Sequence, residues 1–295
     1  MKSISIAILV ILTLVWPIFA QKTTKAPTKV IFAVLNDGKT LEPLAKVENG
    51  KLMQTVGGDA EDAVIKAFNK TYYKPKTIYN LIFGGTVAGT ATVLKNDLQA
   101  ECARNMAEAA TKSVKAKLKG FVMALATNIK PGKAGSGLRR MPTPAERTDM
   151  EKLVLAEFAK NKISGKKLEY HNLTALDVDN DQVPEFVGTF WIATAPTERA
   201  MLFFIAEKAR DGKYALRHSD FRTVKQDEVM SGEIKDVDTG VYHELLLDVL
   251  DYDNDGVAEV FTYTQSFEGA GFTAYQRKKG GWEKVLEAAN YHCGY

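Results

Sequence analysis

Several signatures of catalytic proteins are missing from this sequence. It has no His-Glu-x-x-His zinc motif, no Gly-x-Ser-x-Gly nucleophile turn and no Cys–His signature, so the common sequence patterns of hydrolases are absent. Its 4 histidines occur singly. The 39 basic and 36 acidic residues are interspersed, which argues against the strongly basic surface of a nucleic-acid-binding protein. The sequence therefore names no reaction, and we expect no nucleic-acid partner.

Cysteine is nearly absent as well, since only Cys102 and Cys293 occur. In an oxidising compartment two cysteines can pair, and this bond would tie the end of the chain to its first half. The alternative is two separate buried thiols, and sequence spacing does not test the geometry that a bond needs. We predict a Cys102–Cys293 disulfide.

Long apolar runs are missing from most of the chain, but one stands near its start. Lys2 precedes an apolar run over residues 4–16, and Ala20 offers a small residue for cleavage before Gln21. This order is typical of a secretory signal peptide. An uncleaved membrane anchor is the alternative, but the run is shorter than the ~20 residues that cross a bilayer. We expect removal of residues 1–20, a secreted or periplasmic protein, and no membrane span after cleavage.

The remaining chain, about 275 residues, is enough for one large or two ordinary domains. We predict an N-terminal mostly β domain over residues 21–129 and a second domain over 143–295. A Gly/Pro-rich basic segment over 130–142 separates them and is expected to be a flexible linker. Its glycines do not form a phosphate-binding loop, because no Gly-Lys-Ser/Thr follows them.

Strand patterns dominate the first domain. An apolar strand over 30–35 ends at an Asn-Asp-Gly turn, and Asn49-Gly50 is typical of a type I′ hairpin. Residues 78–93 are β-rich, with glycines that indicate bends or bulges. Residues 98–118 combine helical spacing with alternation over 113–119, which predicts a helix followed by a strand.

The second domain begins with the clearest helix signal in the chain. Thr143 and Glu146 form a capping box around Pro144, because the Thr hydroxyl can accept the N–H of Glu146 and the Glu carboxylate can reach back. Gly165 supplies the stop. The apolar stripe of this docking helix comprises Met150, Leu153, Val154, Phe158 and Ile163.

After this helix the sequence repeats itself. Asp-rich loops begin at Asp177 and Asp251, 74 positions apart, within units over 168–222 and 242–290. Each unit has the order strand, Asp loop, strand, strand, turn, strand, which predicts four antiparallel strands with one face packed on a neighbour. The predicted fold class is mainly β, with repeated antiparallel four-stranded units and one or two helices, arranged like a propeller or as a smaller β assembly.

The Asp spacing has a chemical reason. Calcium takes six to eight oxygen ligands at ~2.3–2.6 Å, and alternate residues of a tight loop can turn their side chains to one point. A Gly at position six suits a positive φ, and a carbonyl and a carboxylate at positions seven and nine complete the shell. The predicted ligands are Asp251, Asp253, Asp255, the carbonyl of Val257 and Glu259 in the second loop, and Asp177, Asp179, Asp181, the carbonyl of Val183 and Glu185 in the first.

Two alternatives bear on these loops. An EF-hand would need a bidentate Glu at position twelve, where Gly188 and Thr262 stand, and its flanks would be helices. An Asx-rich hairpin turn without metal is the other alternative. Without a cation the clustered carboxylates would repel one another, which favours metal at the second loop, whereas Gln182 in the Gly position makes the first loop the poorer site.

At these loops the chain resembles the FG-GAP and VCBS-type repeats of extracellular proteins, whose calcium loops read Asp-x-Asp-x-Asp-Gly-x-x-Asp. Residues 251–259 fit that pattern with Glu in place of the last Asp, and residues 177–185 depart from it at Gln182. The resemblance implies calcium binding and a propeller-like arrangement. The chain is too short for the seven blades common in that family, and no Phe-Gly…Gly-Ala-Pro pair accompanies the loops.

We therefore expect an exported, calcium-stabilised β protein that acts as a binding or structural module for a protein or glycan partner. The alternatives are an exported hydrolase with a site between the two halves and an interaction subunit of an envelope complex. His171 and His243 precede the two Asp loops at similar places, which indicates a shared structural position or an active-site base. The aromatic residues that either form a glycan platform or fill a β core are Trp191, Tyr263, Phe267, Phe272 and Tyr275.

Export yields the first testable prediction. If residues 1–20 are a cleaved signal, the exported protein begins near Gln21, because Ala20 is the small residue that a signal peptidase requires. N-terminal sequencing of the protein recovered outside the cytoplasm checks this. Recovery of a chain that still begins with Met1 would show an uncleaved anchor.

Overall fold

The computed structural model describes residues 28–293 apart from 115–117, 121, 166 and 231–233. Over these residues the chain has 16 strands and 4 helices, so the prediction of a mainly β protein is confirmed. The predicted signal peptide over 1–20 lies outside the described residues, as does part of the predicted strand over 113–119. No described helix is both long and apolar enough to cross a membrane.

Six N-terminal strands close into a ring in the order β1-β7-β4-β5-β6-β2, because β2 pairs with β1 as well as with β6. A seventh strand, β3, extends β2. The ring is a small antiparallel barrel, filled by apolar side chains and by Phe68 and Tyr72 of helix α1 (Asp62–Tyr72). Its strands are β1 (Lys29–Leu35), β2 (Thr40–Glu48), β3 (Lys51–Gln54), β4 (Ile78–Phe83), β5 (Thr86–Lys95), β6 (Ala107–Ser113) and β7 (Val122–Thr127).

The turn predictions for this barrel are confirmed, but the predicted helix within 98–118 is wrong. Asn49 and Gly50 both have positive φ, 52° and 76°, as a type I′ turn between β2 and β3 requires. Residues 98–106 instead form turns that lead into β6. Ala107 and Ala109 alternate with exposed neighbours and fill the barrel interior, so tertiary packing overrides the helical spacing.

The two predicted four-stranded units are present in the predicted order. The first has β8 (Arg139–Arg140) as an added edge strand, followed by β9 (Glu169–Leu176), β10 (Glu185–Ala195), β11 (Glu198–Lys208) and β12 (Tyr214–Lys225). Two short helices, α3 (Gln226–Val229) and α4 (Val237–Gly240), lead to the second unit. That unit consists of β13 (Glu244–Leu250), β14 (Glu259–Ser266), β15 (Gly269–Lys278) and β16 (Gly281–Tyr291).

Helix α2 (Pro144–Lys160) covers the outer face of the first unit. Both hydrogen bonds of the predicted capping box are formed between Thr143 and Glu146. Met150, Val154 and Phe158 are completely buried in the core beneath the helix. The predicted docking role of this helix is confirmed.

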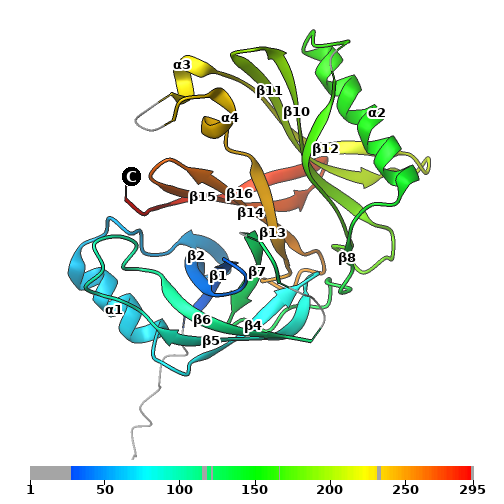
Figure 1. Cartoon of the computed structure of the whole chain (residues 1–295). Helices are drawn as coiled ribbons and strands as arrows, with labels where there is room; N and C mark the ends of the chain where they lie inside the picture. The colour runs from blue at the N-terminus through cyan, green and yellow to red at the C-terminus, as the bar shows by residue number, and fades with distance from the viewer. Residues whose placement is uncertain (1–27, 115–117, 121, 166, 231–233, 294–295) are drawn as a thin grey trace, which may run out of the picture.

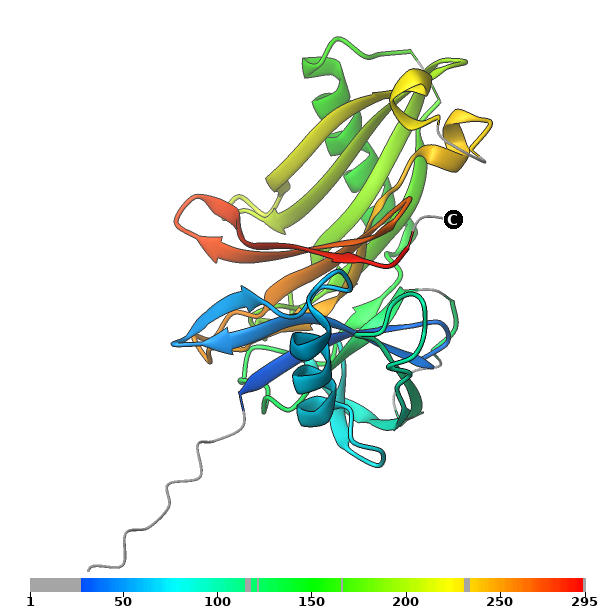
Figure 2. The same ribbon diagram turned by 90° about the vertical axis from the view of Figure 1, so that its left-hand side faces the viewer.

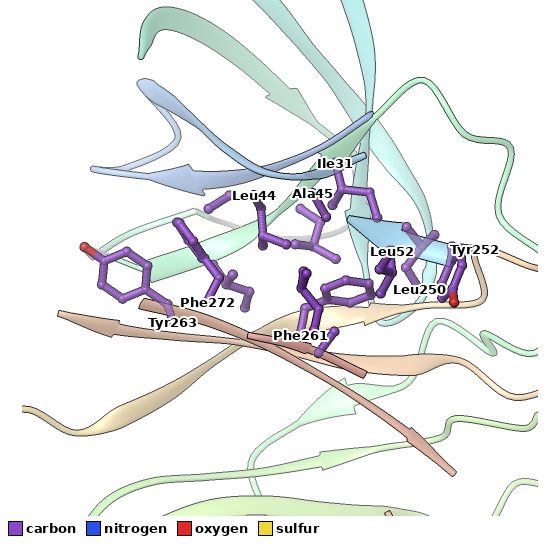
Figure 3. Packing of buried hydrophobic residues seen from close by; sticks show 14 of the residues in the cluster. Ile31, Leu44, Ala45, Leu52, Leu250, Tyr252, Phe261, Tyr263 and Phe272 are labelled. Atoms are coloured by element: carbon purple, nitrogen blue, oxygen red, sulfur yellow. The ribbon is translucent and has the colours of Figure 1, made fainter. Parts of the chain in front are cut away.

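The three sheets are stacked as layers rather than arranged as propeller blades (Figures 1 and 2). The sheet β13–β16 lies in the middle and is apolar on both faces. Phe261 and Phe272 pack against the barrel, as Figure 3 shows, whereas Val260 and Tyr275 pack against the first unit. Of the two arrangements expected from the sequence, the structure has the smaller β assembly.

The segment 130–142 is not a free tether, which corrects the expectation of a flexible linker. The Gly132 N–H donates to the carbonyl of Asp251 at 3.0 Å, and the Gly137 N–H donates to the carbonyl of Gly84 at 2.9 Å. Its last part contains β8, which pairs with β9. The segment is therefore attached to the barrel and to both repeated units.

Cys102 and Cys293 form a disulfide, with Cα atoms 5.5 Å apart and a sequence separation of 191. The bond joins the turn region before β6 to the residues just after β16. It holds the end of the middle sheet against the barrel.

One buried carboxylate connects all three sheets. Asp248 of β13 is fully buried and accepts the backbone N–H groups of Gly84 (3.0 Å), Gly85 (3.3 Å) and Val249 (2.7 Å). Arg139 of β8 donates to it at 3.1 Å and to the carbonyl of Leu247 at 2.6 Å. A buried charge needs such partners, so the interaction fixes the β4–β5 turn and β8 on the middle sheet.

Replacing Asp248 with Ala should lower the free energy of unfolding by about 3–5 kcal/mol, because it removes the buried charge that pairs with Arg139 and the acceptor of two glycine amides. Urea unfolding of the full chain measures this loss. The exposed Asp149, paired with Lys152 at 3.4 Å, is the control, and Asp149→Ala should change stability by about 0.5 kcal/mol or less. Equal effects of the two substitutions would contradict the connecting role.

Candidate metal centre

The two Asp loops have matching backbone conformations. Asn180 and Asn254 have φ of 60° and 65°, and two positions later Gln182 and Gly256 have φ of 69° and 95°. Each loop joins the first two strands of its unit, β9 to β10 and β13 to β14. A left-handed conformation costs a residue with a side chain about 1–2 kcal/mol, so Gln182 strains the first loop where Gly256 relaxes the second.

In the second loop three carboxylates converge. Asp251, Asp253 and Asp255 each offer an oxygen, and these oxygens lie within 4.8 Å of one another. Asp251 is only 1% exposed, and neither of its carboxylate oxygens has a well-aligned hydrogen bond. The backbone amides of Asn254 and Ala134 approach it, but burial and the charges of the two neighbouring aspartates still raise its pKa.

The segment before β8 closes over Asp251. A Cβ atom at Gly132 would lie 2.0 Å from Asp251 Oδ2, so any other residue at this position would clash with the carboxylate. Gly132 therefore lets the backbone lie directly on the carboxylate. Because the Gly132 N–H also bonds the Asp251 carbonyl, this segment forms one wall of the cluster.

Glu259, the predicted ligand at position nine, lies beside the cluster of three. It is 1% exposed, and burial, followed by the charge of Asp253, raises its pKa to about 8. The Gln276 amide donates to Glu259 at 3.0 Å and to Asp253 at 3.2 Å. Gln276 thus bridges the two carboxylates with a neutral group.

The exposed members of this loop also make Asx-turn hydrogen bonds. Asp253 accepts the Asp255 N–H at 3.1 Å, and Asp255 accepts the Val257 N–H at 2.9 Å. These bonds shape the turn and leave each carboxylate further lone pairs. The carbonyls of Val257 and, in the first loop, of Val183 stay predicted ligands.

In the first loop the converging set differs by one residue. Asp177, Asp179 and Glu185 have oxygens within 4.8 Å of one another. Asp181 is not part of that set and accepts the Val183 N–H at 2.7 Å. Burial raises the pKa of Glu185 to about 8. Both loops thus hold an acidic cluster that can bind a metal ion, each built from three of the predicted carboxylates.

The first loop already contains a cation from the protein itself. Arg277 of β15 reaches across from the second unit and donates to Asp179 at 2.5 Å, to Glu185 at 3.3 Å and to Glu207 at 2.6 Å. Trp282 donates to the same Glu207 oxygen at 2.7 Å. The guanidinium neutralises part of the charge that a metal would otherwise balance.

The strand position that holds Glu207 in the first unit holds a neutral residue, Gln276, in the second. Phe186 pairs with Ala206, and Val260, its counterpart, pairs with Tyr275. The next residues, Glu207 and Gln276, therefore correspond. Among the described residues, no Lys or Arg forms an ion pair with the three carboxylates of the second cluster. The second loop is thus the one that lacks a charge partner.

Sequence reasoning found the carboxylates but missed Arg277, Glu207, Gln276 and Gly132. Glu207 and Gln276 lie on strands about twenty residues after their own loops, and no local motif marks them. Arg277 is 98 positions from Asp179, its partner in the first loop. Aligning the repeats by strand pairing would have revealed the Glu207–Gln276 difference. The contacts of Arg277 and Gly132 depend on how the sheets stack, which sequence alone does not give.

Most of the other candidates from the sequence lie at the contact between the two units or in the apolar cores. The His171 and His243 rings stack at 4.2 Å, which joins the two units at a shared position, and burial lowers the pKa of His243 to about 4. Tyr263, Phe272 and Tyr275 are buried in the cores, and Trp191 packs against a separate apolar cluster that contains Met201 and Val237. Phe267 lines a cavity at the β14–β15 turn, and the ring of Tyr263 forms part of the same wall.

Comparisons of the chain with protein-family models, curated proteins and solved structures find no match. The likeness to FG-GAP and VCBS-type repeats rests on the loop residues alone.

The Arg277 contacts predict an exchange of one cation for another. Arg277→Gln should destabilise the protein in chelator by about 3–5 kcal/mol, because Asp179, Glu185 and Glu207 lose their partner. Calcium at about 1 mM should restore part of the loss by occupying the vacated loop. Thermal melts with chelator and with calcium measure both effects.

Arg210 provides the control for this substitution, since it is exposed in the turn between β11 and β12. Arg210→Gln should melt like the wild type in both conditions. A stable Arg277→Gln variant in chelator would mean that the guanidinium does not balance the first loop.

Proposed function

We propose that this chain is an exported, calcium-stabilised β protein that acts as a binding or structural module outside the cytoplasm. Calcium would bind at the second Asp loop, with Asp251, Asp253 and Asp255 as carboxylate ligands, Glu259 close by and the carbonyl of Val257 as a further donor. The first loop would depend on Arg277 in place of a tightly held ion.

The state of Asp251 carries this proposal. Its carboxylate is buried, poorly hydrogen-bonded and faces two further aspartates. An isolated buried carboxylate is very costly unless it is paired, protonated or bound to a metal. Since no described basic side chain pairs with it, a bound cation is the partner that would satisfy both of its oxygens.

The donor chemistry favours calcium among the metals. The cluster offers oxygen atoms alone, without His or Cys, which suits a hard cation and not zinc or copper. Magnesium demands a near-ideal octahedron and keeps its waters, whereas calcium accepts irregular loops of this kind. Asp253 and Asp255 are exposed, so an ion can enter from solvent.

Two further observations support export. The Cys102–Cys293 disulfide suits an oxidising compartment, and the expected signal peptide would direct the chain there. Extracellular-type calcium sites have Kd values near ~10⁻⁴–10⁻³ M, which are useful only where calcium is millimolar. In that setting the ion would hold together the Gly132 segment and the β13–β14 loop.

A thermal melt tests the calcium site. With a Kd near ~10⁻⁴ M, about 1 mM calcium adds about 1.4 kcal/mol of stability, which for a chain of this size raises Tm by roughly 3–6 °C. Asp253→Ala should abolish most of the rise, because it removes a ligand charge. Asp179→Ala should reduce it less, because Arg277 already occupies the first loop.

The matched control is Asp211→Ala. Asp211 accepts the Lys213 N–H at 3.0 Å, so it makes the same kind of Asx turn as Asp253 but lies outside both clusters. This variant should keep the full calcium response. If the wild type melts at one temperature in chelator and in calcium, the loops are hairpin turns and the calcium role is wrong.

A further inference from the structure

A cavity of about 400 Å³ lies between the barrel and the β14–β15 hairpin, and no role has been assigned to it above. It is remote from the Asp loop, because β14 begins beside that loop at Glu259 and ends at the cavity at Ser266. Its walls come from both halves of the chain. The lining side chains include Glu42, Met106, Tyr242, Tyr263, Phe267 and His292.

Glu42 is the polar centre of this cavity. Its side chain is fully buried although it stands in the apolar strand β2. One oxygen, Oε1, accepts from Asn290 Nδ2 and from His292 Nε2, both at 2.7 Å. The other, Oε2, is buried without a hydrogen-bond partner.

The surroundings hold Glu42 in place. Asn290 accepts the N–H of Gly58 at 2.8 Å and an amide hydrogen of Asn105 at 2.7 Å. His292 is adjacent to Cys293, whose disulfide partner Cys102 lines the cavity. The carboxylate is therefore oriented by a rigid network, and the unpartnered Oε2 is not explained by a mobile side chain.

The cavity combines one buried carboxylate with aromatic and apolar side chains. Among the described residues that line it there is no Lys or Arg, and His292 is the one basic side chain. Its apolar and aromatic lining residues are Leu35, Met106, Tyr242, Tyr263 and Phe267, and the neutral polar side chains of Asn36, Gln265 and Ser266 line it as well. Aromatic faces attract cations, and a charged donor forms the strongest hydrogen bond to a carboxylate.

We propose that this cavity binds a small organic cation, with its ammonium group at Glu42 and an apolar or aromatic body against Tyr242 and Phe267. A ligand N–H would supply the donor that Oε2 lacks. The inference deepens the binding role in the proposed function and rests on it in that respect, but it does not require calcium.

Isothermal titration of the mature, oxidised chain with three probes of one shape tests the proposal. Phenethylamine is the cation, 2-phenylethanol the neutral isostere and phenylacetate the anion. Phenethylamine should bind at least about tenfold more tightly than 2-phenylethanol, because its hydrogen bond to Glu42 is charge-assisted. Phenylacetate should not bind.

Two variants locate the site. Glu42→Gln replaces the carboxylate with a neutral amide of the same shape. This variant should bind phenethylamine about tenfold more weakly, and no more tightly than it binds 2-phenylethanol. Glu48→Gln, on the exposed end of the same strand, should bind as the wild type does. Phe267→Ala should weaken phenethylamine by roughly threefold to thirtyfold, whereas Tyr170→Ala, exposed on β9, should not.

If Glu42→Gln fails to fold, the comparison of Phe267→Ala with Tyr170→Ala decides. The proposal is wrong if phenethylamine does not bind at millimolar concentration, if 2-phenylethanol binds equally well, or if folded Glu42→Gln binds undiminished. Titrations in calcium and in chelator separate the two roles. If phenethylamine binds but the melting temperature does not depend on calcium, the cavity binds a cation and the calcium proposal is wrong.

Discussion

The arrangement of the whole molecule depends on Asp248, a carboxylate buried where three sheets meet. It lies on the middle sheet, accepts the amides of the β4–β5 turn of the barrel and receives Arg139 from the first unit. Apolar contact alone would let the sheets slide, because such contact has no preferred direction. Directed hydrogen bonds to one buried charge fix their relative positions, and the double glycine at Gly84-Gly85 provides the close backbone approach that these bonds need.

The two Asp loops balance similar charge in different ways. In the first loop Arg277 supplies a permanent cation, fixed by Glu207 and Trp282. In the second loop Gln276 replaces the acid at the corresponding strand position, and the aspartates lack a basic partner among the described residues. A built-in guanidinium balances the first loop without a metal ion, whereas an open cluster would make stability depend on the metal ions present. The stability of the first repeat would then not depend on a metal ion, whereas that of the second would.

Much of the C-terminal half could be predicted from sequence, because its signals are local. The capping box at Thr143, the repeated Asp spacing and the strand order of both units each depend on residues close together in the chain. The closed barrel, the packing of residues 130–142 and the contacts of Arg277 could not be predicted, because they arise between distant segments. The false helix within 98–118 has the same origin, since alanines suit either a helix or a narrow barrel interior. The glutamate at position 42 is invisible to patterns for a similar reason, because its partners follow some 250 positions later.

The position of the last sheet in the stack has a consequence for how the chain folds. The strands β13–β16 follow the barrel and the first unit in the sequence yet occupy the middle layer, with apolar residues on both faces. Until β13–β16 are synthesised, the barrel and the first unit each expose an apolar surface that has no partner to pack against. Burial of these surfaces must therefore wait for β13–β16, and contacts of such long sequence separation form slowly. During that interval the two apolar surfaces stay exposed, and surfaces of this kind make a folding intermediate prone to aggregate.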